Sequence, residues 1–311
     1  MDTGGHFENP RGLPFLVDNR LVSHDGIRLD NSKRKNAVSC LRKFYWEHYR
    51  GLKSKYGSTA LRYGNVYHEC MRGYYQGIID HGWDDQALLM NLGVQAAREQ
   101  WNKLTDGKIW YTDYRTFENC MECFIGYLGT YAEDRNYIEI VSTEQAFSIP
   151  FQLTDREHNV YGYLPPITST GKIDLQMKMR GVPWILDFKT TSYAISIVSQ
   201  GLAKSMQLIN YTWAALAALG YMPEGAMTSI VYSSSRKGKD GNYGKLSTDY
   251  GRVPVIYTAE DIAQWRESYL KTVADIYECF DRNSWPCNFD SCYLYNKQCP
   301  YMGLCMQPCH I

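Results

Sequence analysis

The longest strand-like part of the chain is residues 138–192, where apolar and polar positions alternate with the period of two that β-strands produce. The alternation is clearest in residues 173–177 and 184–190, and Arg180-Gly181 between them is typical of a hairpin turn. We therefore predict an antiparallel pair of strands here, within a strand region that begins with Ile138–Pro150.

Helical spacing surrounds this strand region. Residues 39–132 are predicted to be mostly helical, and further helices are predicted at 200–220, which Gly220 would end, and at 259–280. Strand-like segments near 228–233 and 253–258 separate the last two helices. This order predicts an α/β fold, with a central mixed sheet flanked by helices and a helical region ahead of the sheet.

The domain organisation follows from length and composition. With 311 residues the chain can form one large domain, and no linker, repeat or low-complexity tract interrupts residues 40–305. We predict a polar, irregular segment over 1–38 and a single domain over 39–311, with an α/β core at 138–280 and a cysteine-rich tail at 281–311. The chain shows neither a secretory leader nor a membrane-spanning run, which predicts a cytoplasmic protein without membrane contact.

The predicted hairpin carries two acids and a lysine in a pattern that suits metal-dependent hydrolysis. Asp174 lies on the first strand and Asp187-x-Lys189 on the second, where both side chains would leave the face opposite Leu186 and Phe188. Two carboxylates can hold a divalent metal beside an activated water, a combination that hydrolyses phosphodiesters. An Asp-x-Lys sequence also arises by chance on solvated strands, so the hairpin alone does not identify an enzyme.

Two predicted helices add polar side chains that could serve the same site. His68 borders an apolar stripe that consists of Val66, Tyr67, Cys70, Met71 and Tyr74. Gln207 and Tyr211 are four residues apart and share one helix face. Each also has a plainer interpretation, as a structural histidine beside a core and as part of an ordinary amphipathic helix.

The cysteines indicate an inorganic group. The chain has ten, many for a reducing compartment, and five lie in the turn-rich last 25 residues: Cys287, Cys292, Cys299, Cys305 and Cys309. The spacing Cys292-x6-Cys299-x5-Cys305 lacks the close pairs typical of zinc and favours a [4Fe–4S] cluster, although Cys305-x3-Cys309 leaves zinc open. Cys40 is the best candidate for a distant fourth ligand, and such a group would order the tail.

Taken in order, these elements resemble the PD-(D/E)xK nucleases of the RecB-like type. The resemblance is closest to the branch with a [4Fe–4S] cluster, which includes CRISPR-adaptation exonucleases, AddB-type nuclease domains and phage-encoded exonucleases. The matching residues are Cys40, His68, Asp174, Asp187-x-Lys189, Gln207-x-x-x-Tyr211, Cys292, Cys299 and Cys305. Many relatives place two of the last three cysteines two residues apart. This chain does not, so Cys309 stays an alternative ligand, and we interpret Cys287 as non-ligating.

The resemblance implies a restriction-endonuclease-like sheet with a cluster-stapled tail and a deoxyribonuclease activity that depends on Mg²⁺ or Mn²⁺. The implied metal ligands are His68, Asp174, Asp187 and the backbone carbonyl of Phe188. Lys189 would activate the water or stabilise the phosphate, and Gln207 and Tyr211 would orient the water or the scissile strand. Glu144, on the preceding strand, is either a supporting acid or a solvent-facing residue.

The implied activity is that of an exonuclease acting on DNA ends or single strands in recombination, repair, phage DNA processing or CRISPR adaptation. A helicase, recombinase or integrase would be its partner, and it would act in the cytoplasm, including that of a phage host. The alternative is a catalytically inactive or zinc-stapled protein that binds nucleic acid or serves as a scaffold.

A net charge of zero excludes an entirely basic surface but leaves room for a local one. Arg236, Lys237 and Lys239 lie in a Ser/Gly-rich loop between two predicted strands. They could contact a phosphate backbone or simply be solvated.

Overall fold

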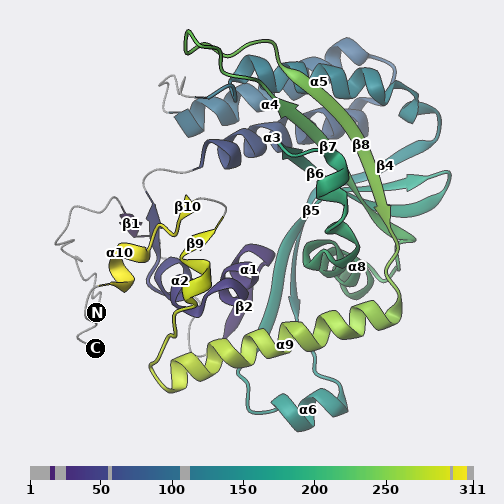
Figure 1. The fold of residues 1–311 in the computed structure, drawn as a ribbon. Helices are drawn as coiled ribbons and strands as arrows, with labels where there is room; N and C mark the ends of the chain where they lie inside the picture. The colour runs from purple at the N-terminus through teal and green to yellow at the C-terminus, as the bar shows by residue number, and fades with distance from the viewer. Residues whose placement is uncertain (1–14, 18–25, 55–57, 106–112, 295–296, 307–311) are drawn as a thin grey trace, which may run out of the picture. The chain divides into compact units, whose positions relative to one another are not determined.

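The computed structural model describes residues 15–17, 26–54, 58–105, 113–294 and 297–306 (Figure 1). Its elements form two compact units, which are described separately. The larger unit comprises residues 58–151 and 168–269, and the smaller unit residues 1–57, 152–167 and 270–311. Among the described residues, no helix combines the length and the apolar character that crossing a membrane requires.

The larger unit is built around a mixed sheet in which neighbouring strands follow the order β4-β5-β6-β7-β8. The β6–β7 pair is parallel and the other three pairs are antiparallel. The strand bounds are Ile138–Pro150 for β4, Ile167–Met179 for β5, Val182–Thr191 for β6, Gly225–Ser234 for β7 and Ser247–Val255 for β8. The mixed sheet with flanking helices confirms the predicted α/β architecture.

The predicted hairpin is present as β5 and β6. Its two-residue turn has φ of +51° at Arg180 and +82° at Gly181, the left-handed conformations that match the twist of a tight hairpin. β6 and β7 are buried along most of their length, as central strands covered on both faces are. The predicted start of the last strand was wrong, since β8 begins at Ser247 rather than near residue 253.

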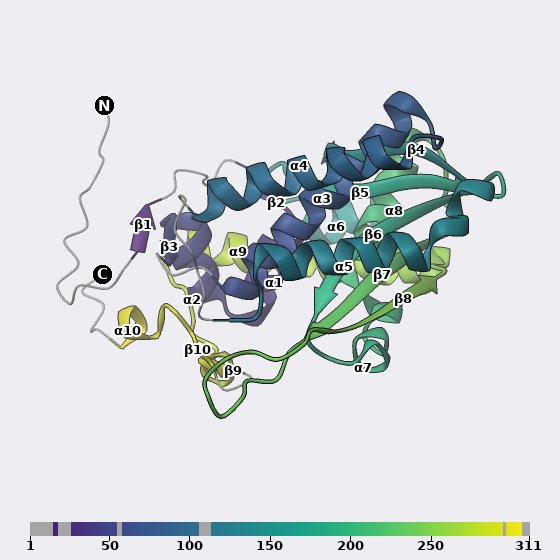
Figure 2. The same ribbon diagram turned by 90° about the horizontal axis from the view of Figure 1, so that it is seen from above.

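Three helices cover one face of the sheet and α8 covers the other (Figures 1 and 2). The three are α3 (Thr59–His81), α4 (Gln86–Thr105) and α5 (Phe117–Thr130). The apolar stripe predicted around His68 is buried in their core. α3 and α4 are closely packed at Gly73, where an added Cβ would lie 2.7 Å from the backbone oxygen of Leu92. Because that position has no room for a side chain, glycine fixes the separation of these helices.

The helix α8 (Met206–Leu219) ends where its sequence predicts, but it begins at Met206 rather than at the predicted residue 200. The Ser205 hydroxyl accepts a hydrogen bond from the Leu208 N–H at 3.4 Å, which caps the first turn. Gly220 follows with φ of +70°, the left-handed conformation that commonly ends a helix. α7 (Ile195–Ser199) and a short 3₁₀ turn at Leu202–Lys204 precede it.

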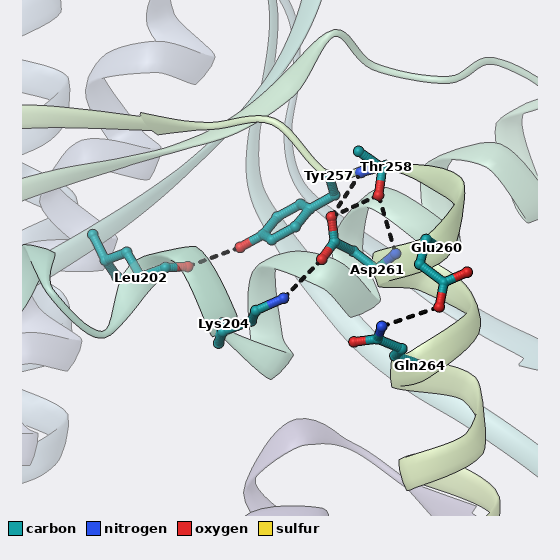
Figure 3. Close-up of polar contacts among 7 residues, drawn as sticks. All are labelled: Leu202, Lys204, Tyr257, Thr258, Glu260, Asp261 and Gln264. Carbon is teal, nitrogen blue, oxygen red and sulfur yellow. Dashed lines mark hydrogen bonds and ion pairs between the residues drawn. The ribbon is translucent and has the colours of Figure 1, made fainter.

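This 3₁₀ turn is tied to the start of α9 (Ala259–Asp281), as Figure 3 shows. The Tyr257 hydroxyl donates to the Leu202 carbonyl at 3.0 Å, and the Lys204 ammonium lies 2.9 Å from Asp261. The Asp261 carboxylate also accepts from the Thr258 N–H at 3.0 Å, while the Thr258 hydroxyl accepts from the Asp261 N–H at 3.2 Å. This reciprocal cap fixes the approach to α8 and hence the helix that carries Gln207 and Tyr211.

The smaller unit contains short elements. Its strands are β1 (Phe15–Val17), which pairs with β3 (Leu52–Ser54), β2 (Ile27–Leu29), and β9 (Tyr293–Leu294), which pairs with β10 (Lys297–Gln298). Its helices are α1 (Asn31–Ser39), α2 (Leu41–Phe44), α6 (Asp155–Tyr161), the end of α9 and α10 (Met302–Cys305). A π-helical turn follows at Tyr45–Tyr49, and 3₁₀ turns lie at Ala132–Asn136, in the larger unit, and at Phe289–Ser291.

The prediction of an irregular segment up to residue 38 was wrong for the part that the structure describes. β2 and most of α1 lie within it. The Asp30 carboxylate caps α1 by accepting from the Lys33 N–H at 2.8 Å, so a polar sequence with little apolar periodicity still forms a helix. The helix α6 was also missed, although Thr154 and Glu157 form a reciprocal capping box at its start.

Candidate active site

The two acids of the hairpin lie where its strands separate. β5 and β6 are paired from Met179 and Val182 as far as Leu175 and Leu186. Asp174 and Asp187 are the next residues on each strand. There the Phe188 N–H donates to the Asp174 carboxylate at 2.9 Å. Next to the last strand pair, a hydrogen bond from backbone to side chain thus replaces the backbone ladder, at the position of both carboxylates.

Asp187 is the most deeply buried acid of the site, with its side chain 0% exposed. The Lys189 ammonium lies 2.8 Å from one of its oxygens as an ion pair, yet among the described residues neither oxygen receives a well-directed hydrogen bond. Burial raises the pKa of Asp187, the Lys189 charge opposes this, and the Asp174 charge adds to it. A buried carboxylate with unsatisfied oxygens is costly, and a divalent cation would satisfy it.

His68, Glu144 and Asp174 form a group that fits a metal ion. One ligand atom from each lies within 4.8 Å of the others. The His68 Nδ1 is 3.2 Å from the Asp174 carboxylate, and the imidazole is 30% exposed. Two carboxylates and an imidazole suit Mn²⁺ or Mg²⁺, with the imidazole favouring Mn²⁺. The residues present therefore fit the metal that the sequence predicts.

The His68–Asp174 pair has opposed charges held together in a partly buried place. Burial by itself lowers the pKa of His68, but the hydrogen bond and the negative charge of Asp174 outweigh it, so the pKa is raised. Burial by itself raises the pKa of Asp174, but the His68 contact and the Phe188 N–H outweigh it, so the pKa is lowered. Each shift favours the ionised form of its own group, as expected for two opposite charges in contact.

Glu144 reaches this group from a strained backbone. Its neighbours Thr143 and Gln145 pair with Leu175 and Ile173, so Glu144 lies opposite Asp174 on β4. Its φ is +50°, a conformation that costs free energy for any residue except glycine. The side chain is 17% exposed and its carboxylate lies 2.6 Å from the Lys172 ammonium. Glu144 is thus partly buried beside Asp174 and His68, which agrees with the supporting-acid interpretation, and its role in metal binding stays a prediction.

Lys189 is connected to α8 by a chain of hydrogen bonds. Its ammonium donates to the Gln207 side-chain oxygen at 3.0 Å, and the Gln207 amide donates to the Tyr211 hydroxyl at 2.9 Å. Burial raises the pKa of Tyr211 well above its usual value, so the phenol stays protonated. The i,i+4 pair predicted from the sequence thus points at the lysine and holds its ammonium in place beside Asp187.

The structure therefore brings six predicted site residues together as two sets in direct contact, His68 with Asp174 and Asp187 with Lys189, Gln207 and Tyr211. The two sets meet where the N–H of Phe188, next to Asp187, donates to Asp174. Phe188 contributes its N–H to Asp174, whereas a ligand role for its carbonyl stays a prediction. Arg236, Lys237 and Lys239 lie in the loop that joins β7 to β8, and their role in binding also stays a prediction.

Five cysteines gather in the smaller unit. Cys287 is hydrogen-bonded to Cys305 and to Cys292, and Cys40 and Cys299 are close enough to raise the pKa values of neighbouring thiols. Burial is the largest cause and raises the pKa of Cys287 to about 12. The Cys40 sulfur accepts from the Asn288 N–H at 3.4 Å. The group includes Cys287, which the sequence interpretation had set apart, and Cys309 lies outside the described residues.

The tail that carries these cysteines also makes ordinary protein contacts. Tyr301 donates to the Leu52 carbonyl at 2.8 Å and packs with Trp46 and Leu304 in a small core. The Ser291 hydroxyl donates to the Ser39 carbonyl at 2.8 Å, next to Cys40. Among the described residues, no three of these sulfurs lie within 4.8 Å of one another, whereas the ligand atoms of His68, Glu144 and Asp174 do. The cluster therefore stays a prediction.

The comparison with protein families identifies the chain. The model of the PD-(D/E)XK nuclease superfamily matches residues 31–306, so the chain belongs to this superfamily. This confirms the coarser part of the resemblance, while the RecB-like branch stays a prediction. Divalent metals are typical of the superfamily, in agreement with the acidic group on β4, β5 and α3.

Two solved structures are similar at low identity. One is described as a "Putative exonuclease" from Eubacterium rectale, with 14% identity over 90% of this chain and 93% of that chain, and a TM-score of 0.49. The other is SSO0001, with 13% identity over 66% of this chain and 74% of that chain, and a TM-score of 0.25. Among curated proteins none matches. At these values the likeness carries no argument about substrate.

Proposed function

We propose that the protein is a metal-dependent deoxyribonuclease, and that it acts as an exonuclease on DNA ends or single strands. The observation that carries this proposal is the buried carboxylate of Asp187. Its oxygens have the Lys189 ammonium as a charged neighbour but lack well-directed donors, in a chain of the PD-(D/E)XK superfamily. Such a carboxylate is expensive to bury unless it serves a cation.

Asp174, Asp187, Glu144 and His68 are the residues that would hold Mg²⁺ or Mn²⁺, with the Phe188 carbonyl as a further oxygen. The bound ion would supply Lewis acidity and a water of lowered pKa. Lys189, fixed by Gln207, places a positive charge where a phosphate gains negative charge during attack. Gln207 and Tyr211 orient the lysine and, through the remaining phenolic hydrogen, a phosphate oxygen or the water.

The cysteine group supports a second, structural cofactor. We propose a [4Fe–4S] cluster held by Cys40, Cys292, Cys299 and Cys305, with Cys287 or Cys309 as the alternative fourth thiolate. Cys40 is separated in sequence from the other ligands by most of the chain, so the cluster would connect the two ends of the smaller unit. Its role would be to hold the tail in place rather than to transfer electrons in the reaction.

The biological setting follows from this activity. DNA would be the principal partner, with a helicase, recombinase or integrase directing the nuclease in recombination, repair, phage DNA processing or CRISPR adaptation. The protein would act in the cytoplasm. A catalytically inactive DNA-binding scaffold is the alternative, and the intact set of acids and lysine argues against it.

Digestion of end-labelled linear DNA and of circular DNA, each single- or double-stranded, with Mn²⁺ or Mg²⁺ tests the proposal. We expect stepwise release of nucleotides from linear DNA and resistance of the circles. Asp187→Asn should lower the rate by about 10² or more, the usual effect of losing a preorganised electrostatic group. Asp249→Asn, an exposed acid on β8, is the matched control and should cut at the wild-type rate. Binding of DNA without any cleavage by the metal-loaded wild type would favour the scaffold.

A further inference from the structure

The connection between β7 and β8 forms an ordered arm over residues 235–246. Lys237 and Tyr243 face each other as a bridge between its two branches. On either side of that bridge, the Gly244 N–H donates to the Arg236 carbonyl at 3.0 Å and the Gly238 N–H donates to the Asn242 carbonyl at 2.7 Å. Figures 1 and 2 show the arm extending beyond the ends of both strands. The arm therefore continues the antiparallel pair β7–β8 beyond the sheet in a defined conformation.

The arm carries a concentrated positive charge. Arg236, Lys237, Lys239 and Lys245 are exposed, against Asp240 as the one acid of the segment. The Asp240 carboxylate is occupied by the Asn242 amide and N–H, at 2.9 and 3.1 Å. Among the described residues, no ion pair joins any of the four cations to a carboxylate. In a chain of zero net charge, this makes the arm a local attractor for an anion.

An aromatic surface lies between these cations. The Lys237 ammonium is 5.8 Å from the centre of the Tyr243 ring, and this ring is 5.9 Å from that of Tyr114. Tyr114 is buried and its hydroxyl donates to the Ser233 carbonyl at 2.8 Å, which fixes it to the base of the arm. Tyr243 remains 37% exposed. A partly exposed tyrosine that packs on a buried tyrosine and lies beside a lysine can stack on an unpaired base.

The arm leaves the sheet at the end where β6, the strand that carries Asp187 and Lys189, also ends. β6 and β7 are parallel, and Lys189 lies level with Ile230. Ser235, where the arm begins, is five residues further along, or about 16 Å at the rise of a β-strand. Tyr193, two residues beyond the end of β6, is 60% exposed at this edge. A strand of a few nucleotides that leaves Lys189 along this edge would meet Tyr193 and then the arm.

We propose that the arm binds single-stranded DNA and holds the strand whose phosphodiester lies at Asp174 and Asp187, with its cations on phosphates and Tyr243 stacked on a base. This inference rests on the proposed nuclease function. A duplex presents phosphates but no exposed base faces, so the tyrosine between the cations favours a single strand over a duplex.

The test measures binding of a fluorescent oligothymidylate and of a duplex of equal length to the full chain, with chelator present so that no cleavage occurs. The triple variant Arg236→Ala, Lys237→Ala, Lys239→Ala should bind the single strand at least tenfold more weakly. The slope of log affinity against log salt should fall by about 2, as expected when three phosphate contacts are lost from a single strand. The matched control Lys103→Ala, Lys178→Ala, Lys271→Ala removes equal charge from exposed or partly exposed sites elsewhere and should leave binding unchanged.

Two further outcomes sharpen the result. Tyr243→Ala should weaken single-strand binding about tenfold, as the loss of one stacked base does, whereas Tyr243→Phe should keep it. Single-strand binding equal to wild type in the triple variant overturns the arm's role, and an equal loss on the duplex overturns its preference. The proposed function fails separately, if metal-loaded wild type cuts no DNA while the binding results stand.

Discussion

Two groups of candidate ligands in this protein differ in how the chain brings them together. The acid–histidine group uses regular elements: two hairpin strands, the neighbouring strand β4 and the helix α3. The cysteine group uses loops and the ends of short helices, and there the Asn288 N–H contacts the Cys40 sulfur across 248 positions of sequence. The first group has opposed charges and unsatisfied oxygens before any ion binds. In the second group, burial raises the pKa values of the thiols of Cys287, Cys292, Cys299 and Cys305. The acid–histidine group can therefore bind a hard cation as it stands, whereas the thiols of the cysteine group must lose their protons before they bind a metal.

The largest effect expected is at the first group. Lys189→Met should lower DNA cleavage by about 10² or more, because it removes the charge beside the scissile phosphate while keeping the volume of the side chain. The metal-free variant should unfold at a lower temperature than wild type, because the buried Asp187 carboxylate would lose its charged neighbour. Lys178→Met, an exposed lysine on β5, is the control for general charge loss. A Lys189→Met enzyme with the wild-type rate would remove the lysine from the mechanism.

The second group is tested by its metal content. Anaerobically purified protein should be brown, with a broad absorbance near ~400 nm and about four irons per chain. Cys40→Ser should bleach it and lower the melting temperature by roughly 5–10 °C, the effect of losing a cross-link worth a few kcal/mol. Buried Cys70 and Cys279, elsewhere in the fold, serve as controls that keep the iron.

The iron content of Cys287→Ser and Cys292→Ser shows which of these two cysteines is a cluster ligand. If Cys287→Ser keeps the iron and Cys292→Ser loses it, the fifth thiol is a neighbour and not a ligand. The reverse result would replace Cys292 with Cys287. Stoichiometric zinc without iron in the wild type would contradict the cluster altogether.

A smaller effect is expected at Glu144, where backbone and side chain have opposite requirements. Glu144→Gly should weaken Mn²⁺ binding about tenfold, by analogy with loss of a group that supports a metal ligand. It should also preserve or raise the melting temperature, because glycine adopts a φ of +50° without strain. Calorimetric titration with Mn²⁺ and thermal unfolding measure the two quantities separately. Unchanged Mn²⁺ affinity would show that Glu144 does not support the metal and serves only as the ion-pair partner of Lys172.

The smallest effect is a pH dependence at His68. Its pKa is raised in the folded, metal-free protein, so the charged His68–Asp174 pair stabilises the fold below the unfolded pKa of about 6.5. That contribution is lost as the pH rises through the raised folded value. Because a metal binds only the neutral imidazole, Mn²⁺ affinity should increase over the same range, and His68→Asn should flatten the profile. A wild-type affinity independent of pH between 6 and 9 would exclude His68 as a ligand.

The sequence was sufficient for the parts of the fold in which local pattern and burial agree. Alternation located β4 and the hairpin, and the apolar stripe located α3 and the position of His68 on it. Spacing of four residues was enough to place Gln207 and Tyr211 on one face of α8. In each case the period of the element determines which side chains share a face.

Features set by long-range contacts could not be predicted in this way. The pairing of β5 and β6 ends at Leu175 and Leu186, and nothing in the alternation signals this end. The positive φ of Glu144 has no residue signature, since glutamate rarely adopts it. Cys287 was interpreted as non-ligating because it precedes the cysteines of the motif, whereas its contacts depend on how the tail folds back on Cys40.

The close contact at Gly73 has a consequence for how this protein tolerates change. Its neighbour across the contact is the Leu92 backbone oxygen, which cannot move aside as a flexible side chain can. Any larger residue must therefore displace α3, the helix that carries His68. In a survey of random variants scored by nuclease activity, Gly73 should be as intolerant as the acids themselves, although it touches no substrate. Variants at the acids would be inactive but folded, whereas variants at Gly73 would be inactive because the protein no longer folds correctly.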